Sequence, residues 1–363
     1  MNWRRNRIPR SELRGWKRVG SELGAFWDVG TWGYLVLIAV VAVSRLADAS
    51  VPVLQPLQAG LPILFAPVWL VLVVAAVTKR WLQVPVALVL AVTFIGSVSP
   101  ARQKVAAPYW VAGVPTVTVV SANVYFANTR PDDVVQTLLA RDADVMVVLE
   151  FTDALADAFN RAGATGLYPY SEVKARQDPG GIAIYSKLAF DQNTELTELK
   201  SPAVRLSLPG GEFLWLAGVH PFPPTSDNEE KRWARSLKDL RRFANGSAGD
   251  DPLALVGDFN ATRWQPGFGT LLAGSMIDAH EAVGKGLTRS WPVASSVPRL
   301  VRLDHALINE RAFPTAVQDF TVPGSDHLAF EVTIAIKATQ APGVASGEDS
   351  IVTTTTKKPK KRK

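Results

Sequence analysis

The chain has 363 residues, no cysteine and a formal net charge of +6 at pH 7. The lack of cysteine excludes disulfides, zinc–thiolate sites and a cysteine nucleophile. The positive charge does not indicate a nucleic-acid-binding face, because much of the excess lies in residues 1–20 and 357–363 and the middle of the chain is close to balanced.

Three long uncharged runs occupy the first hundred residues: 29–44, 49–78 and 81–101. A membrane-spanning helix needs about 20 apolar residues, with a lower limit of about 17. The pattern predicts a membrane domain over 29–101 with three transmembrane helices, preceded by a basic cytoplasmic tail over 1–28. The first run is short, so Asp28 and Arg45 are expected to reach toward lipid headgroups. Two spans, a buried core helix and a signal peptide are the alternatives.

Basic residues beside the spans predict the orientation. The arginine-rich N-terminal segment favours the cytoplasm, and Lys79 and Arg80 fall on the same side if there are three spans. Everything after Pro100 is then expected to be extracytoplasmic. The protein as a whole is expected to be a multi-pass protein of the cell membrane. The loss of one span would reverse this orientation.

The segment 110–337 alternates buried, strand-like runs with charged, helix-like runs, which predicts one α/β domain. Several strands follow one another directly, so two packed sheets with outer helices are favoured over a doubly wound sheet. Strands are predicted at 116–121, 144–149, 181–185, 213–219, 253–256, 303–308 and 328–336, and helices at 131–141, 152–162 and 228–243. Thr152 is a candidate helix cap. Residues 338–363 are polar and then basic, which predicts a disordered tail.

Polar side chains recur at the ends of the predicted strands, where a rigid sheet can aim them into a shared cleft. They are Asn123, Glu150, His220, Asp258, Asn260, Asp304, Asp326 and His327. Taken singly, each has a structural explanation: Asp258 suits a turn, and His305 inside a strand is more typical of a packed histidine than of a ligand. The ordered set favours a site.

The order N-V, L-E, H-P, G-D-F-N, R-L-D-H and S-D-H resembles the endonuclease/exonuclease/phosphatase superfamily over residues 116–336. The strongest pieces are GDFN at 257–260 and SDH at 325–327. The resemblance implies a four-layer αββα sandwich of the deoxyribonuclease-I-like type and a metal-dependent phosphoric ester hydrolase.

Carried over by the resemblance, Glu150 is the main ligand of a Mg²⁺ or Mn²⁺ ion, Asn123 stands beside it, and Asp326 assists the metal or the water. Hard divalent ions of this kind prefer oxygen ligands. Many nucleases of the family carry an acidic residue two places after the first Asn, where this chain has Tyr125; Asn128 is a polar substitute.

The resemblance also implies the remaining roles. His327 pairs with Asp304, while Asp258 orients or deprotonates the attacking water; the sequence leaves open which of them is the base. Asn260 and His220 hold phosphoryl oxygens as charge develops. A further pair of cations, Arg289 and Arg302, are candidate phosphate clamps or surface ion-pair residues. Tyr185 matches a site tyrosine in some nucleases, although a packed strand aromatic is the favoured interpretation.

Membrane spans followed by this domain resemble the teicoplanin-resistance group of bacterial membrane phosphoesterases. That resemblance implies a lipid-linked phosphate substrate such as undecaprenyl diphosphate of cell-wall synthesis. Two alternatives stay open: an extracytoplasmic nuclease acting on nucleic acid, suggested by the basic tail, and a non-catalytic membrane-tethered binding protein. The sequence does not indicate the oligomeric state.

Overall fold

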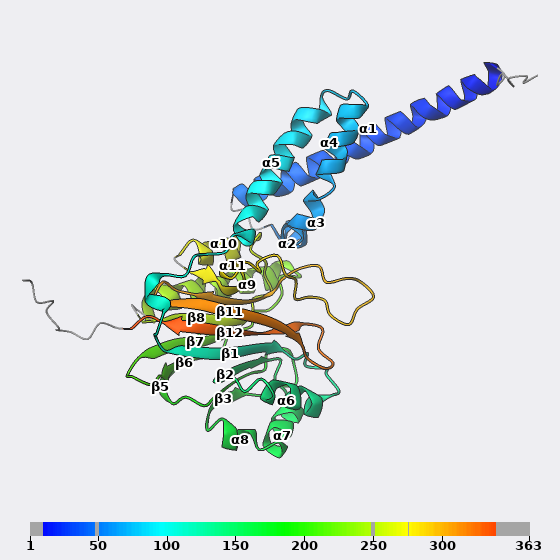
Figure 1. Cartoon of the computed structure of the whole chain (residues 1–363). Coiled ribbons are helices and arrows are strands. Elements are labelled where there is room, and N and C mark those ends of the chain that lie inside the picture. The colour runs from blue at the N-terminus through cyan, green and yellow to red at the C-terminus, as the bar shows by residue number, and fades with distance from the viewer. Residues whose placement is uncertain (1–9, 48–50, 248–250, 275, 339–363) are drawn as a thin grey trace, which may run out of the picture.

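A computed structural model describes residues 10–47, 51–247, 251–274 and 276–338. It has an elongated helical part that projects from one end of a globular part (Figure 1). The predicted disordered tail falls outside the described residues except for Ala338. The predicted N-terminal tail is described only from Arg10, where the first helix begins.

The helical part consists of α1 (Arg10–Leu46), η1 (Pro52–Leu54), α2 (Gln55–Ala59), α3 (Leu61–Phe65), α4 (Val68–Val77) and α5 (Gln83–Arg102). Within the described residues, two helical segments are long and apolar enough to cross a membrane: Gly24–Leu46 of α1, and α5. A bent pair, Pro52–Ala59 and Leu61–Val77, turns through 75° and makes a third if it is one span. The helical part therefore supplies two or three candidate spans.

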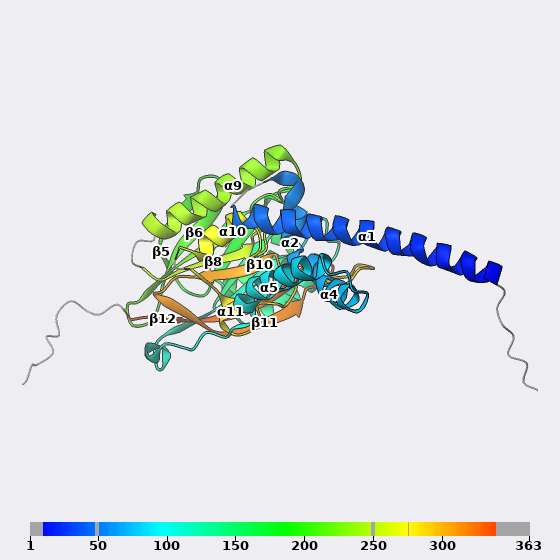
Figure 2. The same cartoon turned by 90° about the horizontal axis from the view of Figure 1, so that it is seen from above.

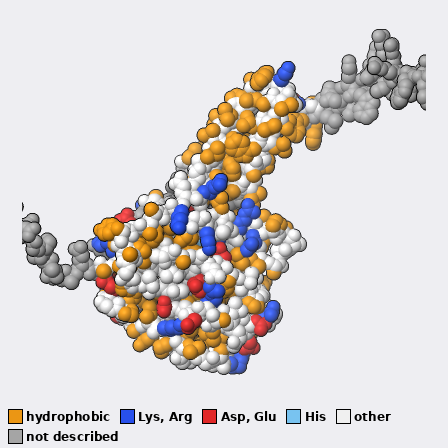
Figure 3. Space-filling model, viewed as in Figure 1, with side chains coloured by type: hydrophobic (Ala, Val, Ile, Leu, Met, Phe, Trp, Pro, Cys, Tyr) orange, Lys and Arg blue, Asp and Glu red, His pale blue; other side chains and the backbone are white. Residues whose placement is uncertain are grey.

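The helical part carries apolar side chains inside and outside. Leu35, Ile38 and Phe65 are buried between the helices, whereas Leu70 and Val89 are more than 60% exposed. Hydrophobic atoms cover most of its visible surface, and Lys and Arg side chains gather where it meets the globular part (Figure 3). Water disfavours such a surface and a hydrocarbon environment favours it.

The charged residues that flank the first span find partners inside the protein. Asp28 accepts hydrogen bonds from Arg80 (2.6 Å) and Gln83 (3.1 Å). Arg45 donates to the carbonyl oxygen of Trp264 in the globular part (3.1 Å). Asp28 and Arg45 therefore have partners within the protein, and their predicted reach toward headgroups stays a prediction.

The globular part contains two six-stranded sheets. The first has the order β11-β12-β1-β2-β4-β3, and the second has the order β5-β6-β7-β8-β10-β9. The strands of the first are β1 (Thr116–Asn123), β2 (Val145–Leu149), β3 (Tyr170–Lys174), β4 (Ile182–Ser186), β11 (Ala312–Thr321) and β12 (Leu328–Ile336). Those of the second are β5 (Phe190–Leu196), β6 (Ser201–Ser207), β7 (Phe213–Val219), β8 (Leu253–Asp258), β9 (Ile277–Asp278) and β10 (Asp304–Ile308).

Helices cover the outer faces of the sheets. They are α6 (Pro131–Leu139), α7 (Asp153–Arg161), α8 (Ala164–Leu167), α9 (Asp227–Arg242) and α10 (Pro266–Leu272), with short helical turns η2 (Tyr109–Val111) and η3 (Phe243–Ser247). The short α11 (Ala279–Ala282) instead contacts strands of both sheets, β10 and β11. One hydrophobic cluster fills the space between the sheets, a second lies between the first sheet and α6–α7, and a third between the second sheet and α9–α10. The predicted α/β class with two packed sheets is confirmed.

The helical part meets the side of the sandwich that carries α10 and α11 (Figure 1). When the protein is viewed from above, this side faces the viewer, and α1 and α9 are both visible on it (Figure 2). Trp264, just before α10, is 6% exposed and packs within the hydrophobic cluster of the helical part. Its indole nitrogen donates to the carbonyl oxygen of Ser97 in α5 (3.3 Å). The two parts are therefore joined by packing as well as by the chain.

Candidate active site

Two parallel strand pairs, one in each sheet, aim polar side chains at the same end of the sandwich. Asn123 is the last residue of β1 and Glu150 follows β2, its parallel neighbour. In the other sheet His220 follows β7, and Asp258 is the last residue of the neighbouring parallel strand β8. Because parallel strands end at the same edge, each pair presents its side chains together.

Gly257 allows β7 and β8 to meet closely behind the site. A Cβ atom at this position would lie 2.1 Å from the carbonyl oxygen of Val219, and its φ of 150° is one that other residues rarely adopt. The glycine of the GDFN motif is therefore required by backbone contact one residue before Asp258.

The backbone also takes left-handed conformations at the site, with φ of 58° at Glu150 and 46° at Asn260. Such conformations are uncommon outside glycine and are held by their surroundings. Glu150 Oε2 accepts a hydrogen bond from the backbone N–H of Phe126 (2.7 Å), and Asp258 Oδ1 accepts one from the backbone N–H of Asn260 (2.8 Å).

The side-chain amide of Asn123 joins the two sheets. Its Nδ2 donates to Glu150 Oε1 (2.9 Å) and to Asp258 Oδ2 (3.1 Å). His220 Nε2 lies 3.7 Å from the same Glu150 oxygen and 3.8 Å from the same Asp258 oxygen. Two carboxylates from different sheets thus share one amide and face one imidazole.

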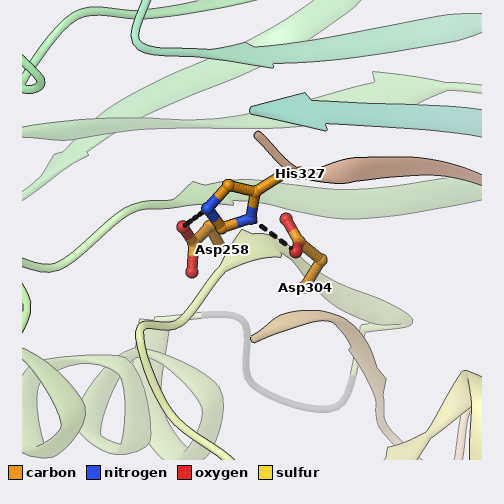
Figure 4. A group of neighbouring side chains, drawn as sticks. All are labelled: Asp258, Asp304 and His327. Atoms are coloured by element: carbon orange, nitrogen blue, oxygen red, sulfur yellow. Dashed lines mark hydrogen bonds and ion pairs between the residues drawn. The ribbon is translucent and has the colours of Figure 1, made fainter. Parts of the chain in front are cut away.

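His327 lies between two buried carboxylates (Figure 4). Its Nδ1 is 2.8 Å from Asp304 Oδ2, and its Nε2 is 3.7 Å from Asp258 Oδ2. Asp304 begins β10 directly opposite Asp258 of β8, which explains why the two acids meet. Ser325 fixes the loop that carries His327, because its hydroxyl donates to the carbonyl oxygen of Asn123 (2.7 Å) and accepts from the His327 N–H (3.0 Å).

The charges of this triad are interdependent. Burial disfavours the imidazolium of His327, but Asp304 and Asp258 outweigh it and raise the pKa of His327 to about 10. Burial raises the pKa of Asp258, with Asp304 adding to the increase and His327 opposing it. Burial also works against ionisation of Asp304, yet the charge and hydrogen bond of His327 lower the pKa of Asp304 below its ordinary value. His327 is therefore a cation at neutral pH and Asp304 its counter-ion.

These groups open onto a pocket of about 380 Å³. Its polar lining residues are Glu150, His220, Thr225, Asp258, Asn260, Asp326 and His327. Asn260 Nδ2 donates to the carbonyl oxygen of Pro221 (2.9 Å), which fixes the orientation of this side chain. Asp326 Oδ2 accepts from the indole nitrogen of Trp291 (3.1 Å). Trp291, which the sequence did not single out, is a lining residue and holds Asp326.

Other candidates lie elsewhere. Tyr185 is 4% exposed and stacks on Phe159 with ring centroids 4.7 Å apart, in the cluster between the first sheet and its helices. His305 binds Asp278 and packs against Phe268, as its packed interpretation predicted. The pocket lining includes neither residue.

Arg302 is buried and bonds the backbone carbonyl of Thr288 (2.9 Å) and the carboxylate of Asp319 (3.3 Å). Arg289 donates to the carbonyl oxygen of Arg299 (3.2 Å). Asn128 bonds the backbone carbonyls of Val124 and Pro323 rather than facing a ligand. These contacts are structural.

A profile of the endonuclease/exonuclease/phosphatase family matches residues 120–327, which is more than half of the chain. The chain belongs to this family. A comparison with curated protein sequences gave no match.

Solved structures of the family share the fold. A TDP2 from D. rerio, humanized by 14 mutations, matches with a TM-score of 0.51 and 14% identity, over 60% of this chain and 98% of that one. An endonuclease/exonuclease/phosphatase from Bacteroides vulgatus matches with a TM-score of 0.51 and 15% identity, over 61% of this chain and 99% of that one. At these identities the likeness establishes the α/β, deoxyribonuclease-I-like fold with two sheets and no more.

The donor set of this family member fits a divalent cation. Asp258, Asp304 and His327 offer ligand atoms that lie within 4.8 Å of one another. Both ring nitrogens of His327, however, face carboxylates in this arrangement. The carboxylate of Glu150, beside the Asn123 amide, suits a hard ion better, because Mg²⁺ and Mn²⁺ prefer oxygen ligands.

Proposed function

We propose that this chain is a membrane-anchored, divalent-metal-dependent phosphoesterase that hydrolyses a phosphate ester or diphosphate of a lipid-linked substrate, such as undecaprenyl diphosphate. The convergence of Glu150 and Asp258 from two sheets in one pocket, where the buried amide of Asn123 joins their carboxylates, carries the proposal. The family implies hydrolysis, and the apolar helices favour a substrate at a membrane. This combination matches the teicoplanin-resistance group that the sequence resembles.

The helical part anchors the enzyme through three spans in this proposal. Lys79 and Arg80 lie between α4 and α5, at the end of the helices away from the globular part (Figure 1). The start of α1, which contains Arg10 and Arg14, lies at the same end of the helical part (Figure 1). The positive-inside rule then assigns that side to the cytoplasm and the catalytic part to the extracytoplasmic face.

Glu150 and Asn123 would hold the metal ion, with Asp326 assisting across the pocket. A bound divalent cation would supply Lewis-acid stabilisation of the charge that develops on the phosphoryl oxygens. Because Mg²⁺ and Mn²⁺ retain several waters, few protein ligands are needed.

The triad and its neighbours handle protons and phosphoryl oxygens. Asp258 orients the attacking water and accepts its proton, since a raised carboxyl pKa makes it a stronger base than an ordinary aspartate. His327 is already protonated, so it donates a hydrogen bond to a phosphoryl oxygen instead of acting as the base. Asp304 keeps it charged and oriented. His220 and Asn260 hold further phosphoryl oxygens.

A nuclease is the second candidate. A D. rerio TDP2 complexed with a single-strand DNA product matches this chain with a TM-score of 0.50 and 16% identity, over 60% of this chain and 98% of that one. The fold is thus compatible with a nucleic-acid substrate. A tethered protein that binds lipid phosphate without turnover is the third candidate.

A substrate screen with the purified full chain in detergent separates the three. Phosphate release is measured with lipid diphosphates, phospholipids, inositol phosphates and DNA in the presence of Mg²⁺ or Mn²⁺, and DNA is also followed on a gel. We expect release from a lipid diphosphate and none from DNA. Cleavage of DNA alone would favour the nuclease, and tight lipid phosphate binding without release would favour the binding protein.

A further inference from the structure

A second pocket adjoins the active-site pocket at the junction with the helical part. It has a volume of about 490 Å³, within the range of small-molecule sites. One wall comes from α2 and α3, including Leu57, Ile63 and Leu64. The opposite wall comes from the catalytic part, including Leu300 and Val301. We refer to it as the junction pocket.

The junction pocket differs in chemistry from its neighbour. No residue that lines it carries a charge, whereas Glu150, Asp258 and Asp326 line the active-site pocket. Two of its polar groups bind each other, since Gln265 Nε2 donates to Gln55 Oε1 (2.8 Å). The remaining wall is mainly Leu, Ile, Val, Ala and Pro. Such a surface favours hydrocarbon over water.

The two pockets adjoin each other. Five residues line both of them: Pro223, Thr225, Asn260, Trp291 and Leu303. Trp291 is at the boundary, with its indole nitrogen on Asp326 of the active-site pocket. A ligand with a charged head and an apolar chain could therefore occupy both at once.

The junction pocket also faces the source of such a ligand. Its α2–α3 wall belongs to the bent pair of helices that turns through 75° where the helical part meets the globular part (Figure 1). On the same helices Ile63 is 40% exposed and Leu70 is 62% exposed. Buried hydrogen bonds from Thr262 and Gln265 to α2 hold this wall against the loop that follows Asp258.

We infer that the junction pocket binds the first part of the hydrocarbon chain of a lipid phosphate, so that its phosphate or diphosphate enters the active-site pocket. This inference rests on the proposed function and adds a chain-recognition site to it. The substrate class is a phosphate or diphosphate on a single hydrocarbon chain. Chain-free phosphates lack this contact.

The test measures kcat/KM for diphosphates of one, two and three prenyl units at a fixed detergent concentration and below the aggregation limit of each. We expect kcat/KM to rise along the series, because each methylene buried in an apolar site contributes up to about fourfold. Equal values along the series would overturn the inference while the proposed function stands. No hydrolysis of any of them would count against the proposed function.

Variants assign the effect to the junction pocket. Ile63→Gln and Leu300→Gln should each lower kcat/KM for the three-unit diphosphate by about tenfold and lower it less for the one-unit compound. Val297→Gln is the matched control, since Val297 is 49% exposed on the same loop as Leu300 and is not a lining residue. Equal loss in Val297→Gln, or no loss in the two pocket variants, would overturn the inference.

A binding measurement makes the inference independent of turnover. Calorimetry with Glu150→Gln should show tighter binding of the three-unit than of the one-unit diphosphate, and Leu300→Gln added to this variant should remove the difference. Equal binding of the two compounds to Glu150→Gln would contradict the junction pocket even if the wild-type protein is active.

Discussion

Gln265 and Gln55 are 210 residues apart in sequence, yet their buried side-chain amides form a hydrogen bond of 2.8 Å. Gln265 ends the loop that starts at Asp258, and Gln55 begins α2. Trp264 beside it fills a place in the core of the helical part. The loop that supplies Asp258 and Asn260 is thus fixed to the helices that would enter the membrane, so the anchor also supports the site.

Trp264→Ala should weaken this junction. The indole is buried and bonds Ser97, so its removal leaves a cavity and breaks a hydrogen bond between the two parts. We expect a Tm several degrees lower for the full chain in detergent, together with lower activity. Trp69→Ala is the control, because Trp69 is 41% exposed on α4 and should change the Tm little. Equal shifts in the two variants would show that the junction does not support the fold.

Gly257→Ala should separate β7 from β8 beside Asp258. The new Cβ would lie 2.1 Å from the Val219 carbonyl oxygen, which must move to make room. We expect loss of activity and a lower Tm. Gly269→Ala in α10 is the matched control, since no atom lies within 4 Å of the added Cβ and alanine favours a helix. An active, stable Gly257→Ala protein would refute the close strand contact.

Asp304→Asn tests the triad. Asp304 acts through His327, which it orients and keeps charged, so the amide should lower kcat about 100-fold or more with a small change in KM. Asp304→Glu should restore part of the rate because it returns the charge. A normal kcat for Asp304→Asn would contradict the role of Asp304 in positioning His327.

Glu281 in α11 makes stability depend on pH. Burial and the nearby Asp278 raise the pKa of Glu281 to about 7, although Arg263 opposes this. The folded state therefore binds a proton that the unfolded state releases near pH 4.5, and stability is lost as the pH rises from about 4.5 to 7. The Glu281→Gln variant has no carboxyl group at this position, so it should not show this loss of stability.

The Tm of Glu281→Gln minus that of the wild type should consequently increase between pH 4.5 and 7 and stay level above pH 7. Thermal unfolding of both proteins in the same buffers measures it, and contributions from other groups cancel in the difference. A difference that is constant across this range would contradict the raised pKa.

The sequence predicted the strands that carry the site because they are buried and apolar. The predicted ranges 213–219 and 328–336 coincide with β7 and β12, and Thr152 caps α7 through a bond from the Leu155 N–H (3.3 Å). It missed β3, β6 and β9, and also β5, which is mostly exposed and polar, and β11, which contains Pro314 and an irregular register. Apolar periodicity is weak in β5 and β11.

The sequence indicated most residues of the candidate site but not the contacts between them. Strand-end position indicated Asn123, Glu150 and Asp258, and the structure brings them within hydrogen-bond distance. Trp291 and Ser325 were missed, because their roles depend on contacts with Asp326 and Asn123 that only the folded chain creates. For Ser325, its place in the SDH motif was the available sequence signal.

Apolar length alone did not predict the break in the second apolar run. Residues 49–78 are uncharged and long enough for one straight span, yet the chain turns through 75° between Ala59 and Leu61. Prolines at 56 and 62 and Gly60 lie around the turn, and contact with the catalytic part holds α2 there.

The central claim is that Glu150 and its neighbours bind one divalent ion for phosphoester hydrolysis. The most direct measurement is phosphate release from a lipid diphosphate as a function of Mn²⁺ concentration, in wild type and Glu150→Gln. The account predicts metal-dependent release by the wild type, and in the variant either none or a requirement for at least about tenfold more Mn²⁺. Release by both proteins with the same metal dependence, or undiminished release in the presence of a chelator, would contradict it.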